Sequence, residues 1–285
     1  MTGYLLAILT GLFYGLHGTY SKKMTQNLPV LLVTWANFTF ILPFLLLALI
    51  WVGIPPVNWQ DFIWAVSLSF LINVAAWYLF FSALQAGTLS RTMPFTAFTP
   101  LFLIPVAFIA LGELPDIFGI AGILLIITGG YGIHLDSRGF LSPIKSMAFN
   151  KGTRSMVLVA LLWSISATAE KVAVLSSSQY FYAIVINLLL ALAYTPLILR
   201  KKNYNFLYFK KNILQLWLMS LLFGLLLLFQ YTALKYLLVS YVIAFKRAGI
   251  IVSLLLGALL FKEKNLKRNL LFTLLILSGV LLIFF

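Results

Sequence analysis

Ten stretches of the chain are apolar and long enough to cross a lipid bilayer, and short breaks separate them. The hydrocarbon core of a bilayer is about 30 Å thick, so a crossing helix needs about 20 apolar residues. The stretches are residues 3–20, 30–52, 60–81, 89–111, 115–134, 154–175, 180–199, 212–233, 237–261 and 267–285. Because these lengths suit helices, and a helix satisfies its own backbone in lipid, we expect an all-α integral membrane protein with ten transmembrane helices.

The composition agrees with a membrane protein and excludes several functions. Charged residues make up 9% of the chain and hydrophobic residues 62%, whereas a soluble domain carries about 25% charge. The absence of cysteine excludes disulfides and thiol catalysis. Met1 to Thr10 has no basic region, so we interpret the first stretch as a transmembrane helix and not as a cleaved signal peptide.

The positive charge is confined mostly to one set of loops. The loops after the odd-numbered helices contain Lys22, Lys23, Arg91, Arg138, Lys145, Lys151, Arg154, Arg200, Lys201, Lys202, Lys210, Lys211, Lys262, Lys264, Lys267 and Arg268. The other loops contain only Lys171 and Lys235. By the positive-inside rule the odd-numbered loops are cytoplasmic and both termini lie outside. The formal net charge of +14 therefore indicates contact with lipid headgroups and no nucleic-acid partner.

The two halves of the sequence repeat each other. A shift of about 150 residues places Ala83-Leu84 on Ala233-Leu234, Ser90 on Ser240, Phe95 on Phe245, Glu113 on Glu263 and Gly129 on Gly279. Equivalent loops have opposite charge character: residues 53–61 contain no Lys or Arg, and residues 200–211 are rich in both. Because each half has an odd number of helices, the two halves would lie in opposite orientations in the membrane. Equivalent loops would then face opposite sides, which explains the reversal of their charge. We therefore predict a 5+5 inverted repeat around a central cavity, with repeats at 1–135 and 154–285 and a cytoplasmic connecting loop at 136–153.

Two segments carry a family resemblance. The segment Leu111–Gly129 begins Leu-Gly-Glu-Leu-Pro-Asp, and Leu256–Lys264 followed by Leu274–Gly279 has the corresponding pattern in the second half. Both resemble the helix 4–helix 5 region of the EamA family. With the ten predicted helices, the resemblance covers nearly the whole chain. It implies a member of the drug/metabolite transporter superfamily, which includes amino-acid exporters, nucleotide-sugar carriers and plastid phosphate translocators.

Lys246 and Arg247 stand inside the ninth predicted helix. Lys246 lies nine residues, or roughly 13 Å, from the start of that helix, which is too deep for easy snorkelling to an interface. Insertion scales give a free-energy cost of roughly 2.5–3.5 kcal/mol for each such cation. With only six acidic residues in the chain, we expect the pair to bind an anionic group of the substrate; the alternative is an ion pair with Glu170. The segment Phe245-Lys-Arg247 also resembles the Lys-Arg pair with which the phosphate translocators grip phosphate. The body of the fourth helix, at Thr96 and Thr99, lacks their further lysine.

Glu170 and His17 are the other titratable candidates. Glu170, near the end of the sixth helix, is interpreted either as a proton or ion-pair site or as an ordinary interface acid. His17, in the first helix, is interpreted as a hydrogen-bonded structural residue or as a proton relay. With His134 as the only other histidine, we expect no metal and no cofactor.

The remaining candidates are hydroxyl, aromatic and amide side chains. Pro94, Pro100 and Pro105 should bend the fourth helix, which we expect to face the ninth helix across the cavity. We predict that the cavity lining includes Tyr14, Trp77, Tyr78, Phe95, Thr96, Thr99, Trp163, Tyr241 and Phe245. The amides Asn37, Asn73, Asn187 and Gln230 are interpreted as interhelical contacts or as ligands.

These features favour a secondary transporter that moves a small polar, anionic or carboxylate-bearing metabolite by alternating access. The alternative is a proton-coupled exporter of amino acids, amines or quaternary ammonium compounds that uses Glu170. The sequence has no nucleophile–base pair or carboxylate dyad that would indicate an enzyme. A channel would need a continuous polar lining or oligomeric rings. We expect a monomer or homodimer in a bacterial cytoplasmic (inner) membrane.

Overall fold

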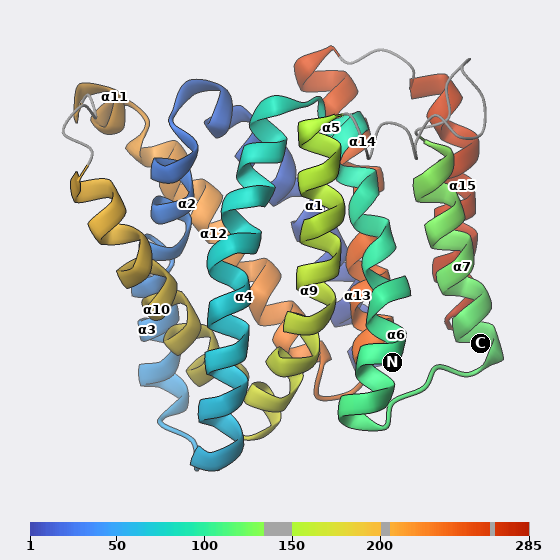
Figure 1. The fold of residues 1–285 in the computed structure, drawn as a ribbon, viewed down its shortest axis with the longest axis horizontal. Coiled ribbons are helices and arrows are strands. Elements are labelled where there is room, and N and C mark those ends of the chain that lie inside the picture. Colours follow the sequence, from blue (N-terminus) through green and yellow to red (C-terminus); the bar gives the residue numbers. More distant parts are fainter. Residues whose placement is uncertain (134–149, 201–205, 263–265, 285) are drawn as a thin grey trace.

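The computed structural model describes residues 1–133, 150–200, 206–262 and 266–284, and all regular structure in these ranges is helical (Figure 1). Most of the connecting loop predicted at 136–153 lies outside the described residues, as do His134 and Glu263. The helices of the first half are α1 (Thr2–Asn27), α2 (Val30–Thr39), α3 (Leu42–Val52), α4 (Trp59–Ala86), α5 (Leu89–Thr92), the 3₁₀ helix η1 (Met93–Phe98), α6 (Thr99–Leu111) and α7 (Ile117–Gly132). Those of the second half are α9 (Lys151–Leu175), α10 (Gln179–Arg200), α11 (Phe206–Lys211), α12 (Ile213–Ala233), α13 (Val239–Ala248), α14 (Ile250–Phe261) and α15 (Leu266–Leu282).

Seven of the ten predicted spans correspond to helical segments that are long and apolar enough to cross a membrane. Within the described residues these are Val30–Val52, Trp59–Ala86, Met93–Leu111, Lys151–Leu175, Gln179–Arg200, Ile213–Ala233 and Val239–Phe261. The other three predicted spans fall on helices that do not meet both criteria. Of these, α1 has 26 residues with many polar side chains, and α7 and α15 have 16 and 17 residues. The chain is therefore an integral membrane protein, and its described part is all-helical.

Short polar caps explain where several helices begin. The side chain of Asp116 accepts a hydrogen bond of 2.7 Å from the backbone N–H of Gly119 at the start of α7. Asn58 and Asn150 cap α4 and α9 in the same way. Such caps satisfy backbone N–H groups that have no partner inside the helix. The three capped helices begin within four residues of the starts predicted from the sequence.

Three of the long spans are broken near their middle, and the span Val30–Val52 divides into α2 and α3 at Phe40–Ile41. In the first half, α5 passes into the 3₁₀ helix η1, which has Pro94 at its start, and α6 begins with Pro100 in its first turn. A proline inside a helix removes a backbone hydrogen bond and clashes with the preceding turn, so the predicted distortion of this helix is confirmed. In the second half, α13 ends at Ala248 and α14 begins at Ile250, with Gly249 between them. Neither this break nor the one between α2 and α3 was predicted.

The helices form a bundle in which distant parts of the sequence pack together. The most extensive helix pairs are α4 with α9, α7 with α15, and α1 with α12. At one edge of the bundle α7 lies beside α15, and α2, α3 and α10 form the opposite edge (Figure 1). Between these edges, α1 also contacts α13 and α14, and α9 contacts η1 and α6. The broken spans η1–α6 and α13–α14 therefore lie against the central helices α9 and α1.

A glycine contact sets the distance between α1 and the broken span α13–α14. A Cβ atom placed on Gly11 would lie 2.5 Å from the backbone oxygen of Phe245. A Cβ atom on Gly249 would meet the backbone oxygen of Gly11. Only glycine permits this approach. It brings the end of α13, with Lys246 and Arg247, against α1.

Candidate functional site: a buried cation pair at a central cavity

Lys246 and Arg247 occupy the last turn of α13, just before the break at Gly249. They are almost fully buried, with exposed fractions of 6% and 1%. Arg247 is among the largest side chains in the interior. Carrying a charge into a low-dielectric interior costs several kcal/mol unless polar partners or an opposite charge compensate it. The neighbours of each cation therefore indicate what the site binds.

The partner of Lys246 is an amide. Its Nζ donates a hydrogen bond of 2.7 Å to Oε1 of Gln230 on α12. The Nε2 of Gln230 in turn donates a hydrogen bond of 2.9 Å to Oε2 of Glu170 on α9. Among the described residues, the only ion pair within 4.0 Å joins Lys171 and Glu113. The alternative of a direct Lys246–Glu170 ion pair is therefore replaced by an amide bridge.

Arg247 lies between aromatic rings. Its Cζ is 5.1 Å from the ring centre of Tyr14 and 5.3 Å from that of Trp163. Lys246 Nζ is 5.5 Å from each of the same rings, so both cations gain cation–π stabilisation. Nevertheless, Nε and Nη1 of Arg247 have no hydrogen-bond partner among the described residues. Buried guanidinium donors without acceptors are costly, and an anion would satisfy them.

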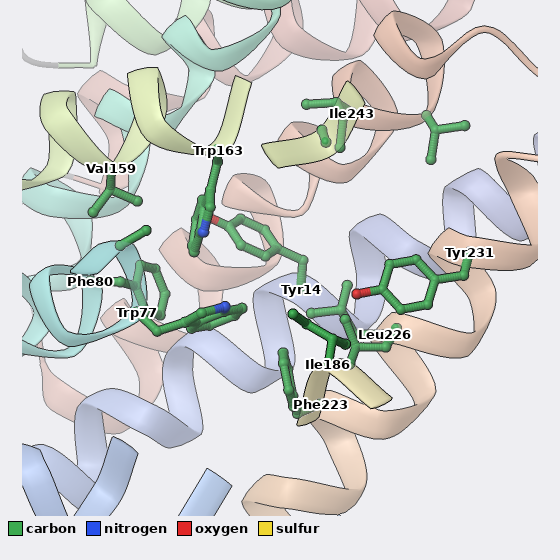
Figure 2. Close-up of a cluster of buried hydrophobic side chains, with 14 of the residues drawn as sticks. Tyr14, Trp77, Phe80, Val159, Trp163, Ile186, Phe223, Leu226, Tyr231 and Ile243 are labelled. Carbon is green, nitrogen blue, oxygen red and sulfur yellow. The ribbon is translucent and has the colours of Figure 1, made fainter. Parts of the chain in front are cut away.

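The two cations line a small cavity near the centre of the bundle. Its volume is about 20 Å³, which is room for about one water molecule. The charged and amide lining consists of Asn73, Glu170, Asn187, Gln230, Lys246 and Arg247. The aromatic lining consists of Phe38, Trp77, Trp163, Phe223 and Tyr231. Figure 2 shows Trp77, Trp163 and Tyr14 gathered on one side of the buried cluster and Tyr231 on the other.

A hydrogen-bonded network extends from Glu170 away from the cations. Ser166 donates a bond of 2.9 Å to Oε1 of Glu170, and Asn73 Nδ2 donates a bond of 2.6 Å to Ser166 Oγ. Ser69 Oγ lies 2.7 Å from the hydroxyl of Tyr182 and 3.2 Å from Ser166 Oγ. This network joins α4, α9 and α10. It fixes the Glu170 carboxylate in one position at the cavity wall.

Five predicted lining residues are buried beside the site but do not line the cavity. Tyr14, Phe95, Thr96, Thr99 and Phe245 are 0–1% exposed and are absent from its wall. Thr96 accepts a hydrogen bond of 3.0 Å from Tyr14, so it orients the ring that covers the cations. Phe245 packs its ring against Tyr4 and Phe284. These residues pack around the site without lining the cavity.

Two predicted lining residues lie elsewhere. Tyr78 is 44% exposed, because residues one apart on a helix point about 100° apart and Trp77 takes the inward direction. Tyr241 lies at the start of α13, where its hydroxyl accepts a hydrogen bond of 3.3 Å from the backbone N–H of Asp116. Its position five residues before Lys246 places it near the end of the bundle. The predictions for Tyr78 and Tyr241 are corrected accordingly.

His17 is fully buried and does not line the cavity. Its Nε2 lies 2.9 Å from Oδ1 of Asn37 and 3.2 Å from Ser21 Oγ. The rings of Trp77, Phe81 and Phe223 surround it. These contacts favour the structural interpretation. No group of three or more potential metal ligands occurs among the residues that the structure describes.

The sequence did not identify several residues of the site. Phe38, Phe223 and Tyr231 line the cavity, but aromatic residues occur throughout the chain and nothing in the pattern separates these from core residues. Gln230 was noted only as a buried amide. Its position 16 residues before Lys246 is on a different helix, so its bridging role depends on the packing of three helices.

Comparisons with known proteins agree with the fold. The model of the EamA-like transporter family matches residues 1–135 and 150–285. A solved structure, described only as "Crystal structure of protein", superimposes with a TM-score of 0.72 at 16% sequence identity, over 98% of this chain and 95% of that chain. None of the curated proteins compared with the chain matches it. The family match covers both halves, and the chain belongs to the EamA-like transporter family of the drug/metabolite transporter superfamily.

Proposed function

We propose that the protein is a secondary active transporter that moves a small polar, anionic or carboxylate-bearing metabolite by alternating access. The observation that carries this proposal is the burial of Lys246 and Arg247 at a central cavity, with two Arg247 nitrogens lacking acceptors. A carboxylate or other anion would supply those acceptors. Charge-assisted hydrogen bonds of this kind are about twice as strong as neutral ones.

The proposal includes ten transmembrane helices arranged as a 5+5 inverted repeat. Matching helix contacts support it: α1 packs on α12 as α9 packs on α4, and α1 contacts α13–α14 as α9 contacts η1–α6. The helix breaks at 98–99 and at 249 also correspond at a shift of about 150 residues.

Two lysines add a more specific match. Lys22 Nζ donates to the backbone oxygen of Gly87, and Lys171 Nζ donates to that of Leu237. The shift of about 150 residues places Lys22 on Lys171 and Gly87 on Leu237, to within one residue. In a two-fold arrangement these bonds would close opposite ends of the transporter.

The size of the cavity supports alternating access. A volume of about 20 Å³ is far below the 300 Å³ or more of typical small-molecule sites. A metabolite therefore enters only if helices move apart. We propose the broken spans η1–α6 and α13–α14 as hinges. Non-helical backbone at membrane depth is tolerated where it is buried in protein, as in η1, or lines a cavity, as at the end of α13.

We place the transporter in a bacterial cytoplasmic membrane, as a monomer or homodimer, with lipid and substrate as its partners. The outward-facing surface is rich in large apolar side chains, such as Leu71, Ile109 and Leu259 at 69%, 84% and 75% exposure, which suits direct contact with lipid tails. The loop charges favour a cytoplasmic loop at 136–153 and termini outside.

A second candidate function is proton-coupled export of amino acids or amines. It is favoured by the position of Glu170 in the cavity wall beside aromatic side chains such as Trp77 and Trp163. A carboxylate and aromatic faces are the elements that bind ammonium groups. The two functions differ in the charge of the ligand.

The test is a thermal-shift screen of the purified protein against carboxylated, phosphorylated and cationic metabolites. We expect anions to stabilise the wild-type protein, and Lys246→Gln and Arg247→Gln to lose that stabilisation. Lys235→Gln and Arg200→Gln, at exposed positions, are matched controls that should retain it. Stabilisation by cations alone would reject the proposed function in favour of the amine exporter.

A further inference from the structure

The bridge Glu170–Gln230–Lys246 sets the charge of the cavity. Gln230 turns its carbonyl oxygen to the Lys246 ammonium, at 2.7 Å, and its amide nitrogen to the Glu170 carboxylate, at 2.9 Å. Ser166 occupies the second oxygen of Glu170. Each end group of the bridge therefore already has a polar partner inside the protein.

The formal charges of the bridge cancel. If Lys246 is protonated and Glu170 is ionised, the sum is zero, and it remains zero if that proton moves from the lysine to the carboxylate. Among the described residues, Glu170 is the only acid in the cavity wall. The other acids in the described part of the chain, Asp61, Glu113 and Asp116, lie in or beside connecting segments.

Arg247 is consequently the one uncompensated charge at the cavity. Its guanidinium is 1% exposed, and its Nε and Nη1 lack acceptors. Tyr14 and Trp163 cover it with ring faces but provide no negative charge. A ligand with one net negative charge would bring the site to neutrality.

We infer that the site selects substrates with one net negative charge, and that Glu170 is the residue that determines this selection. The inference rests on the proposed function, because it refines the substrate class of the same site. A dianion would leave one negative charge buried and uncompensated, and a neutral zwitterion would leave Arg247 uncompensated. Either mismatch is costly in a low-dielectric site.

Glutamate and glutamine have the same shape, so the charge of the bridge can be changed without changing its size. Glu170→Gln raises the site charge from one positive to two, and Gln230→Glu lowers it to zero. The double variant Glu170→Gln/Gln230→Glu moves the carboxylate by one side chain and keeps the wild-type charge. It is the matched control for both single variants.

The probes are three compounds with the same phenyl body: phenylacetate, phenylsuccinate and phenylalanine, which are a monoanion, a dianion and a zwitterion at pH 7.5. Their affinities for the purified protein in detergent are measured by isothermal titration calorimetry. We expect wild type to prefer phenylacetate. Glu170→Gln should shift the phenylsuccinate-to-phenylacetate affinity ratio upward by on the order of tenfold or more, because juxtaposed charges have large effects on selectivity.

Gln230→Glu should weaken both anions, phenylsuccinate more than phenylacetate, and make phenylalanine the best of the three ligands. The double variant should return to the wild-type order. If either single variant fails to give monodisperse protein, the test uses the double variant and Lys246→Gln. The substitution Lys246→Gln also brings the net charge of the site to zero.

If anions bind but the order of the three probes is the same in every variant, the inference is overturned and the proposed function stands. If no anion binds to the wild type, both are overturned. Recovery of the wild-type order in the double variant would support the inference, because total charge and not the position of one carboxylate would then decide the selection.

Discussion

Lys171 holds together three parts of the chain at one end of the bundle, and we expect its loss to be costly. It lies near the end of α9 and is 7% exposed. Its Nζ donates a hydrogen bond of 2.7 Å to the backbone oxygen of Leu237 and pairs with Glu113. Glu113 also accepts a hydrogen bond of 2.8 Å from the backbone N–H of Val239, at the start of α13.

The substitution Lys171→Met keeps most of the side-chain volume and removes the charge. Breaking a buried ion pair by removing one partner typically costs about 3–5 kcal/mol, because the other charge is left uncompensated. The side chains of Lys171 and Glu113 are 9% and 14% exposed, so some solvent reaches them. We therefore expect a loss near the lower end, about 3 kcal/mol, and a fall in melting temperature of roughly 5–10 °C.

The assay is thermal unfolding in detergent, arranged as a double-mutant cycle. Lys171→Met and Glu113→Gln should each destabilise the protein, and the double variant should recover at least half of the loss, since no unpaired charge remains. Lys235→Met, at an exposed position in the same connection, is the control. Melting temperatures that add in the double variant, or single variants within about 1 °C of wild type, would refute the reasoning.

The same contact should control access to the cavity. Because the chain has no cysteine, one cysteine at Ala167, which lines the cavity and is 3% exposed, reports its accessibility directly. We expect a membrane-impermeant maleimide to react faster with Ala167→Cys/Lys171→Met than with Ala167→Cys, from one side of the membrane only. An unchanged rate would show that the contact stabilises the fold without closing the cavity.

Two further predictions concern packing and topology. Gly11→Ala should destabilise the protein by about 1–3 kcal/mol in thermal unfolding, because the added Cβ would lie 2.5 Å from the backbone oxygen of Phe245. The control is Gly152→Ala, which should change stability little because the nearest neighbour of its Cβ would be 3.4 Å away. Reporter fusions should place both termini outside and the 136–153 loop in the cytoplasm, and a cytoplasmic C-terminus would overturn that orientation.

The sequence predicts the helical framework well, because the signals are local. Long apolar stretches define the helices, and the prolines at 94 and 100 define where one of them is distorted. The break at Gly249 was missed because a single glycine is common within membrane helices. Gly249 acquires its role only from the close approach of α1 at Gly11.

The sequence predicted those site residues that stand out by the free-energy cost of burying a charge in the membrane. Lys246 and Arg247 stand out because a cation deep in a membrane helix needs a reason. Glu170 was recognisable for the same cause. Their link through Gln230 could not be predicted, because it depends on the relative rotation of α9, α12 and α13. Likewise, only the packing of α4 shows that Trp77 points inward and Tyr78 outward.

The central claim, transport of an anion through the Lys246–Arg247 site, is tested most directly by counterflow in proteoliposomes. Vesicles loaded with the monocarboxylate that best stabilises the protein are diluted into a trace of the labelled compound. We expect transient accumulation of label with wild-type protein and none with Arg247→Gln, while Arg200→Gln behaves as wild type. Accumulation by Arg247→Gln at the wild-type rate, or leakage of label without accumulation, would contradict the account.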